Sequence, residues 1–199
     1  FFRNMQVVSV SCGFKHTAAV TSDGKLYTWG NGDEGATGHS TTMNIDSPRL
    51  VVPLEREHMR LVACGYQHTL CTDGRTVWAF GNNYSGKLGL GDTNNQDTPR
   101  RVEALSIALD DEAAAAEMGS ICKLECGENH SAALTSTGRL YTWGAGGSGQ
   151  LGHGDESDKW TPTRVEGPLE DKQVIDVALG ANFSLALTSE LEVYAWGTN

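Results

Sequence analysis

One segment occurs four times along this chain, and this internal repetition limits the possible folds more than any other feature. The copies contain the glycines Gly13, Gly65, Gly127 and Gly180, which lie 52, 62 and 53 residues apart. Their sequences are CGFKHTAAVTSDGKLYTWG, CGYQHTLCTDGRTVWAFG, CGENHSAALTSTGRLYTWG and LGANFSLALTSELEVYAWG. A spacing of roughly 50 residues indicates one supersecondary unit copied in tandem.

Each copy has the pattern of short β-strands. Val8, Val10 and Cys12 alternate with serines, and residues 26–29 form another strand-like run. Alternation with period two predicts half-buried strands. Each unit contains several such runs and no convincing helix, so it predicts about one four-stranded sheet. A ring of such sheets is a β-propeller, whereas a linear β-solenoid, the alternative, usually has shorter repeats.

Tight turns separate the strand-like runs. Asp23-Gly24 and Asp73-Gly74 fit hairpin turns, because glycine adopts a positive φ without a Cβ clash. The third copy has Thr137-Gly138 at this position, but the fourth has Leu191. The fourth turn is therefore expected to differ from the others or to carry strain.

Three copies share a longer series of motifs. A Gly-x-x-His stretch is followed by Trp-Gly or Phe-Gly, a glycine-rich loop and a proline. The loops include Gly86-Lys87-Leu88-Gly89 and Gly149-Gln150-Leu151-Gly152. This series resembles the regulator of chromosome condensation repeat family over nearly the whole chain. The resemblance implies a seven-bladed β-propeller.

The expected fold is therefore all-β, with four-stranded antiparallel blades in an incomplete ring. We expect residues 1–199 to form part of one propeller domain. Its repeats are expected at about 1–52, 53–103 and 119–166, with a partial repeat at 167–199 and an insertion at 104–118.

The chain corresponds to about half of a seven-bladed ring. Such a ring needs roughly 360 residues, and the chain has 199. Open end sheets would expose apolar surface, which monomers rarely do over large areas. Three explanations stay open. The chain is a piece of a longer polypeptide that supplies the remaining blades, a second copy closes the ring, or the arc is independent.

Charge and cysteine content restrict the partners. The net charge of −10 disfavours nucleic acid and anionic membranes, because both are bound mainly through lysine and arginine. No apolar run reaches transmembrane length. Five cysteines, an odd number, mostly lie in expected strands. They are typical of reduced thiols in a cytoplasmic or nuclear protein.

The insertion at 104–118 is rich in alanine and acidic residues. Asp110, Asp111 and Glu112 would suit the N-terminus of a short helix. We expect either a protruding loop that binds a partner or a solvated insertion between blades.

A Cys-x-x-x-His spacing recurs in the first three copies. Zinc requires four converging ligands, but equivalent positions of a ring lie on successive blades. The fourth copy has Leu179 and Phe183 at these positions, which indicates a packing role with hydrogen-bonded histidines. The sequence therefore predicts no metal. It also predicts no cofactor and no catalytic residue, because no Ser-His-acid or Cys-His set stands out from the repetition.

The two residues between glycine and histidine differ from copy to copy, whereas the residues around them repeat. We expect them to form a protein-binding face at one end of the blades. They are Phe14, Lys15, Tyr66, Gln67, Glu128, Asn129, Ala181 and Asn182. The function expected first is a non-catalytic scaffold for protein–protein interaction. The alternative, implied by the family resemblance, is guanine-nucleotide exchange on a small GTPase of the Ran type.

Overall fold

Four antiparallel sheets make up the computed structural model, which describes residues 1–106 and 112–198. The first sheet contains β1 (Val7–Cys12), β2 (His16–Thr21), β3 (Leu26–Gly30) and β4 (Ile45–Leu50). The second contains β5 (Leu61–Cys64), β6 (His68–Thr72), β7 (Val77–Gly81) and β8 (Gln96–Arg101). The third contains β9 (Ile121–Cys126), β10 (His130–Thr135), β11 (Leu140–Gly144) and β12 (Lys159–Arg164). The fourth contains β13 (Val174–Leu179), β14 (Phe183–Thr188) and β15 (Val193–Gly197).

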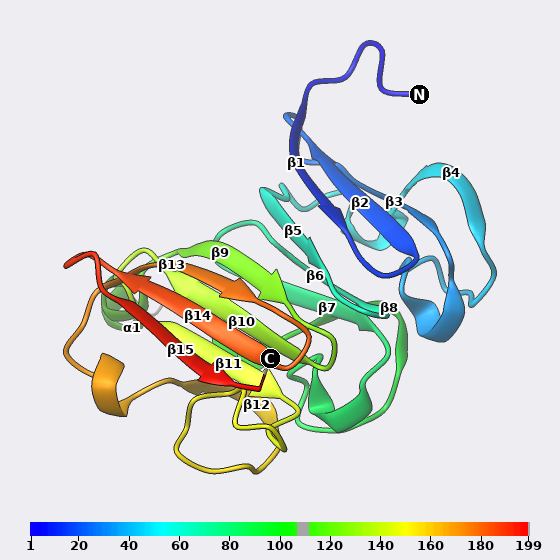
Figure 1. The fold of residues 1–199 in the computed structure, drawn as a ribbon. Coiled ribbons are helices and arrows are strands. Elements are labelled where there is room, and N and C mark those ends of the chain that lie inside the picture. Colours follow the sequence, from blue (N-terminus) through cyan, green and yellow to red (C-terminus); the bar gives the residue numbers. More distant parts are fainter. Residues whose placement is uncertain (107–111, 199) are drawn as a thin grey trace.

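The sheets are arranged radially, as blades of a propeller. Within each sheet the strands follow chain order, and the first strands of successive sheets pack beside one another: β1 by β5, β5 by β9, and β9 by β13. Figure 1 shows the blades side by side, from the blue sheet of β1–β4 to the orange and red strands β13–β15. The expected all-β, incomplete propeller is confirmed, and a straight solenoid is excluded.

The strand register is the same in every blade. His16 pairs with Gly30, His68 with Gly81, and His130 with Gly144. Gly30 has a φ of 105°, and a Cβ there would lie 2.5 Å from the carbonyl oxygen of Lys15. Only glycine fits this conformation and this close approach.

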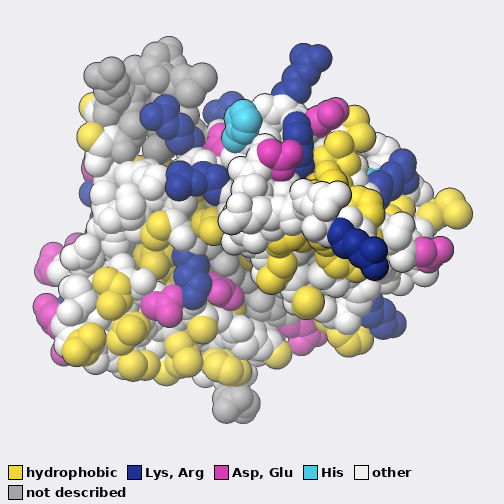
Figure 2. Space-filling view, turned by 90° about the horizontal axis from the view of Figure 1, so that it is seen from above, with side chains coloured by type: hydrophobic (Ala, Val, Ile, Leu, Met, Phe, Trp, Pro, Cys, Tyr) yellow, Lys and Arg dark blue, Asp and Glu magenta, His cyan; other side chains and the backbone are white. Residues whose placement is uncertain are grey.

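The core lies between blades. One cluster joins the first and second sheets, another the second and third, and another the third and fourth. Apolar residues on the two outer sheets remain uncovered. Val10 is 68% exposed, whereas Val62 and Leu124 at the matching positions are 7% and 6% exposed. Likewise, Val193 is 67% exposed where Leu26 is 1% exposed. Figure 2 shows hydrophobic side chains gathered along the lower left edge of the view.

A short 3-10 turn follows the last strand of each complete blade. These turns are η2 (Val52–Leu54), η4 (Glu103–Leu105) and η5 (Gly167–Leu169), and each buries its leucine. Residues 104 and 105 therefore belong to the repeated unit and not to the insertion that the sequence predicts at 104–118.

The remainder of the insertion contains one helix, α1 (Glu112–Met118). Glu112 is its first residue, and Asp110 and Asp111 lie outside the described residues. Glu117 of the helix forms an ion pair of 3.0 Å with Arg139 of the third blade. Among the residues that the structure describes, no helix is long and apolar enough to cross a membrane.

The fourth hairpin turn keeps the geometry of the others. Leu191 has a φ of 63°, in the left-handed region where Gly24 and Gly138 have 80° and 81°. Its N–H donates to the carbonyl of Thr188, as that of Gly138 does to Thr135. The expected strain at this turn is thus confirmed.

Candidate protein-binding face

Two sets of loops lie at the same end of the blades, because neighbouring strands are antiparallel. One set joins the first and second strands and contains residues 13–15, 65–67, 127–129 and 180–182. The other set is glycine-rich, follows the third strands, and contains residues 31–44, 82–95 and 145–158. Backbone hydrogen bonds of 2.8 Å join the two sets, for example from Asn31 to Lys15 and from Asn82 to Gln67. We call this end of the blades the display face.

Four residues that the sequence places in separate repeats meet at the centre of this face. Phe14, Tyr66, Glu128 and Ala181 line a single open hollow of about 510 Å³ together with their neighbouring glycines. The loops are tied together by backbone hydrogen bonds, including one of 3.1 Å from Phe14 to the carbonyl of Gly65. The structure therefore brings the first member of each predicted pair to one surface around the ring axis.

Phe14 and Tyr66 stack on each other. Their ring centroids are 4.4 Å apart with an interplanar angle of 21°. Even so, Phe14 is 56% exposed and Tyr66 is 37% exposed. The ammonium of Lys15 lies 5.1 Å from the centre of the Phe14 ring. The pair is thus fixed in orientation and still presents a flat apolar surface to solvent.

The second member of each predicted pair also supports the scaffold. The backbone carbonyls of Lys15, Gln67, Asn129 and Asn182 each accept a hydrogen bond from the loop or segment after the third strand. In addition, the side-chain oxygen of Asn129 accepts a hydrogen bond of 2.9 Å from Lys87. Lys87 is only 1% exposed, and its burial lowers its pKa to about 8.

Below the face, a hydrogen-bond relay joins each blade to the next. His16 Nε2 lies 2.8 Å from the hydroxyl of Thr69, and His68 Nε2 lies 3.0 Å from that of Ser131. Each hydroxyl donates its own proton to a loop carbonyl, that of Ala36 for Thr69 and that of Lys87 for Ser131. The imidazole Nε2–H must therefore be the donor to the hydroxyl.

The relay continues from His130 to Ser184, at 3.1 Å. Burial lowers the pKa of His16 and of His130 to about 4, so both rings are neutral at physiological pH. The predicted packing role of hydrogen-bonded histidines is confirmed. Within residues 1–106 and 112–198 there is no group of three or more His, Cys, Asp or Glu side chains that could hold a metal ion.

The display face has two further exposed aromatic residues that the sequence pattern does not indicate. Tyr84 is 64% exposed and Trp160 is 50% exposed, and they lie in or beside the glycine-rich loops. Comparing the repeats could have revealed Trp160, because Asp97 occupies the matching position of the second blade. The scaffold does not require an aromatic ring there.

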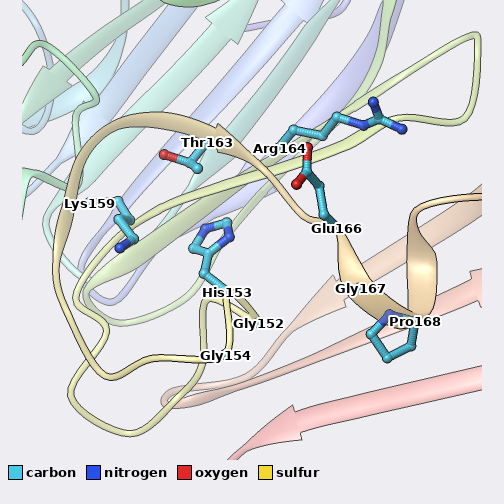
Figure 3. Close-up of a pocket in the computed structure, with 9 residues that line it drawn as sticks. All are labelled: Gly152, His153, Gly154, Lys159, Thr163, Arg164, Glu166, Gly167 and Pro168. Carbon is cyan, nitrogen blue, oxygen red and sulfur yellow. The ribbon is translucent and has the colours of Figure 1, made fainter.

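A second hollow, of about 450 Å³, lies beside the third blade. In Figure 3, Lys159, His153, Arg164 and Glu166 line it from β12 and from the segments on either side. Ser40 and Gly91 correspond to Gly154 in the first and second blades. Each donates its N–H to a carbonyl on the outer strand of the next blade, Ser40 to Asp97 and Gly91 to Trp160. The fourth sheet has three strands in the described residues. The hollow thus lies where, in the earlier blades, the glycine-rich loop meets the outer strand of the next blade.

Comparison with known proteins places this geometry in a family. Residues 2–199 match the RCC1-like domain family, so the chain belongs to it. It is 40% identical to the human E3 ubiquitin-protein ligase HERC2 over 196 residues, which is 97% of the chain but 4% of HERC2.

Solved structures agree with this assignment. Human WBSCR16 has a TM-score of 0.80 and 26% identity, over 98% of the chain and 49% of its own length. Prp20p from Saccharomyces cerevisiae, whose structure was described with its binding to Gsp1p and histones, has a TM-score of 0.76 and 25% identity. That match covers 97% of this chain and 44% of Prp20p. The chain therefore spans half or less of each of these proteins.

Proposed function

We propose that this chain is a non-catalytic protein-binding unit that holds its partner on the display face. The observation that carries the proposal is the stacked, exposed pair of Phe14 and Tyr66. Aromatic rings that are held rigidly at a surface supply much of the energy of protein interfaces at little cost in conformational entropy. The neighbouring blades supply a stiff support, because the relay of histidines and hydroxyls joins them below the face.

The charge of the face supports a protein partner over nucleic acid or an anionic membrane. Its loops carry seven carboxylates and two lysines, and one of these lysines, Lys87, is buried. Phosphate groups would meet repulsion here, since nucleic-acid binding depends on exposed lysine and arginine. A protein can instead match both the aromatic pair and the surrounding carboxylates.

The test is partner capture with the protein at its full natural length. We expect the double variant Phe14→Ala and Tyr66→Ala to lose at least one partner that the unchanged protein retains. The control is Val52→Ala, which removes an exposed apolar side chain from the opposite end of the blades. Identical sets of captured partners for the unchanged protein and the aromatic double variant would contradict the proposal.

Guanine-nucleotide exchange on a small GTPase is the second candidate. The likeness to Prp20p, which was described with its binding to Gsp1p, favours it. Exchange requires only that a protein surface displace the segments that hold the nucleotide, so the display face could perform it without catalytic side chains. Accelerated nucleotide release from a panel of small GTPases, lost in the aromatic double variant, would support exchange over simple docking.

A further inference from the structure

The outer rim of the display face has an aromatic patch of its own. Of the five aromatic side chains exposed in the described residues, Phe14, Tyr66, Tyr84 and Trp160 lie on the display face, and Phe1 lies near the start of the chain. Tyr84 belongs to η3 (Tyr84–Gly86), and Trp160 belongs to β12. The two elements are in contact. We call Tyr84, Trp160 and the carboxylates of Asp92, Asp155, Glu156 and Asp158 the rim patch.

Trp160 is fixed against the loop of the preceding blade. A Cβ on Gly86 would lie 2.6 Å from its ring and 2.7 Å from its Cα, so the tryptophan packs directly on this glycine. Its backbone carbonyl accepts a hydrogen bond of 2.9 Å from Gly91. Half of the side chain is nevertheless in solvent. The ring is thus preorganised and incompletely buried, which is typical of an interface anchor.

The scaffold does not explain these two aromatic residues. Asp97 makes the same backbone contact one blade earlier, where the N–H of Ser40 donates to its carbonyl at 2.9 Å. Asp33 and Gly147 occupy the positions that match Tyr84 in the first and third copies. Since aspartate and glycine fill these positions without loss of the fold, the fold does not require tyrosine or tryptophan there.

The carboxylates around the two rings define the chemistry of a partner. Asp92 follows Gly91 directly, and Asp155, Glu156 and Asp158 lie in the loop that leads into β12. The nearby Lys159 is paired with Asp155 at 2.9 Å. The rim patch therefore combines electron-rich ring faces with an excess of negative charge. Lysine and arginine are attracted by both features.

We propose that the rim patch docks a lysine- and arginine-rich segment of a protein partner, with Tyr84 and Trp160 stacking on its cationic side chains. The inference rests on the proposed function, because it also places a protein partner on the display face. It adds a second contact area, separate from Phe14 and Tyr66, and it specifies the partner's charge. An acidic segment is disfavoured by the carboxylates, and a second copy of this chain, itself acidic, is disfavoured by its net charge of −10.

The experiment measures binding of labelled peptides to the protein at its full natural length. The probes are a peptide of alternating lysine, arginine, glycine and serine, and an acidic peptide of equal length. We expect Trp160→Ala with Tyr84→Ala to weaken binding of the basic peptide about tenfold. Glu156→Lys should also weaken it and reduce its salt dependence, because this exposed glutamate contributes charge.

Matched controls separate the two proposals. Phe14→Ala with Tyr66→Ala should leave binding of the basic peptide within about twofold while it removes captured partners. Equal affinity of the basic peptide for the unchanged protein and the rim variant, or preference for the acidic peptide, would overturn the rim inference and leave the proposed function standing. Self-association that the rim variant abolishes would overturn it as well, because a second copy would then occupy the patch.

Discussion

His68 donates a hydrogen bond to Ser131 across the boundary between the second and third blades, over 3.0 Å. The serine hydroxyl in turn donates to the backbone carbonyl of Lys87, which also receives the indole N–H of Trp143 at 2.9 Å. A carbonyl of one blade is thereby held by two side chains of the next. The contact fixes the angle between blades and so positions the loops of the display face.

Removal of this hydroxyl should destabilise the fold. In Ser131→Ala, the buried Nε2–H of His68 loses its acceptor, and we expect the free energy of unfolding to fall by about 1–3 kcal/mol. Urea denaturation measures the change. Ser157→Ala, the same substitution at an exposed serine, is the matched control and should change stability by less than about 0.5 kcal/mol. Equal effects of the two variants would show that the relay contributes nothing.

The relay histidines should make stability depend on pH. Burial lowers the pKa of His16 and His130 from 6.5 to about 4 in the folded state. Below pH 6.5 the unfolded chain therefore binds protons that the native state does not. Their contribution to stability is fully present above pH 6.5 and is lost progressively as pH falls towards about 4.

One variant isolates this effect from that of the carboxylates. His130→Phe introduces the residue that the fourth copy has at the matching position, Phe183. It should reduce the slope of unfolding free energy against pH by up to about 1.4 kcal/mol per pH unit between pH 6 and 4.5. Urea denaturation at several pH values measures the slope. An unchanged slope would mean that His130 is protonated in the folded protein.

The strained fourth hairpin turn offers a stabilising substitution. Leu191→Gly should raise the free energy of unfolding by about 0.5–1 kcal/mol, because relief of the left-handed leucine exceeds the entropy cost of glycine. The reverse change at an unobstructed turn is the control. Gly74 has a φ of 100°, and a Cβ there would meet its nearest atom at 3.5 Å. Gly74→Ala should therefore destabilise through backbone strain alone. The midpoint temperature of thermal unfolding measures both effects. A shift in the same direction for the two variants would contradict this interpretation.

A paired polar contact should behave as a unit. Thr142 donates to the carbonyl of Leu151, and its hydroxyl lies 3.0 Å from His153 Nε2. The second blade has Ala79 and Leu90 at these two positions. Thr142→Ala alone should cost about 1–2 kcal/mol, and adding His153→Leu should recover about 1 kcal/mol of it. Strictly additive effects in a double-mutant cycle would show that the two residues are independent.

Repetition made the fold predictable from the sequence. The evidence for blades was the strand alternation around Val8 and Val10, the turn glycines and the fifty-residue period. Comparing the four copies also predicted the strain at Leu191, which stands where the other copies have glycine. The boundary of the insertion was less predictable. Leu105 lies next to alanine-rich sequence, and only its burial in the core shows that it matches Leu54 and Leu169.

The candidate site was only partly predictable. Phe14 and Tyr66 were identified because they vary within a constant frame, but their stacking depends on the distance between blades. The contact of Lys87 with Asn129 joins residues of different blades that no local pattern relates. The sequence did not point to Trp160, because tryptophan is common in β-strands and its place in a strand needs no special explanation. Its exposure depends on the loop of the neighbouring blade.

The claim that the display face holds the partner can be tested most directly by amide hydrogen exchange. The full-length protein would be compared free and in complex with a captured partner. We predict slower exchange in residues 13–15, 65–67 and 127–129, with unchanged exchange at the opposite hairpin turns, residues 22–25, 73–76 and 136–139. Protection confined to those opposite turns would contradict the account.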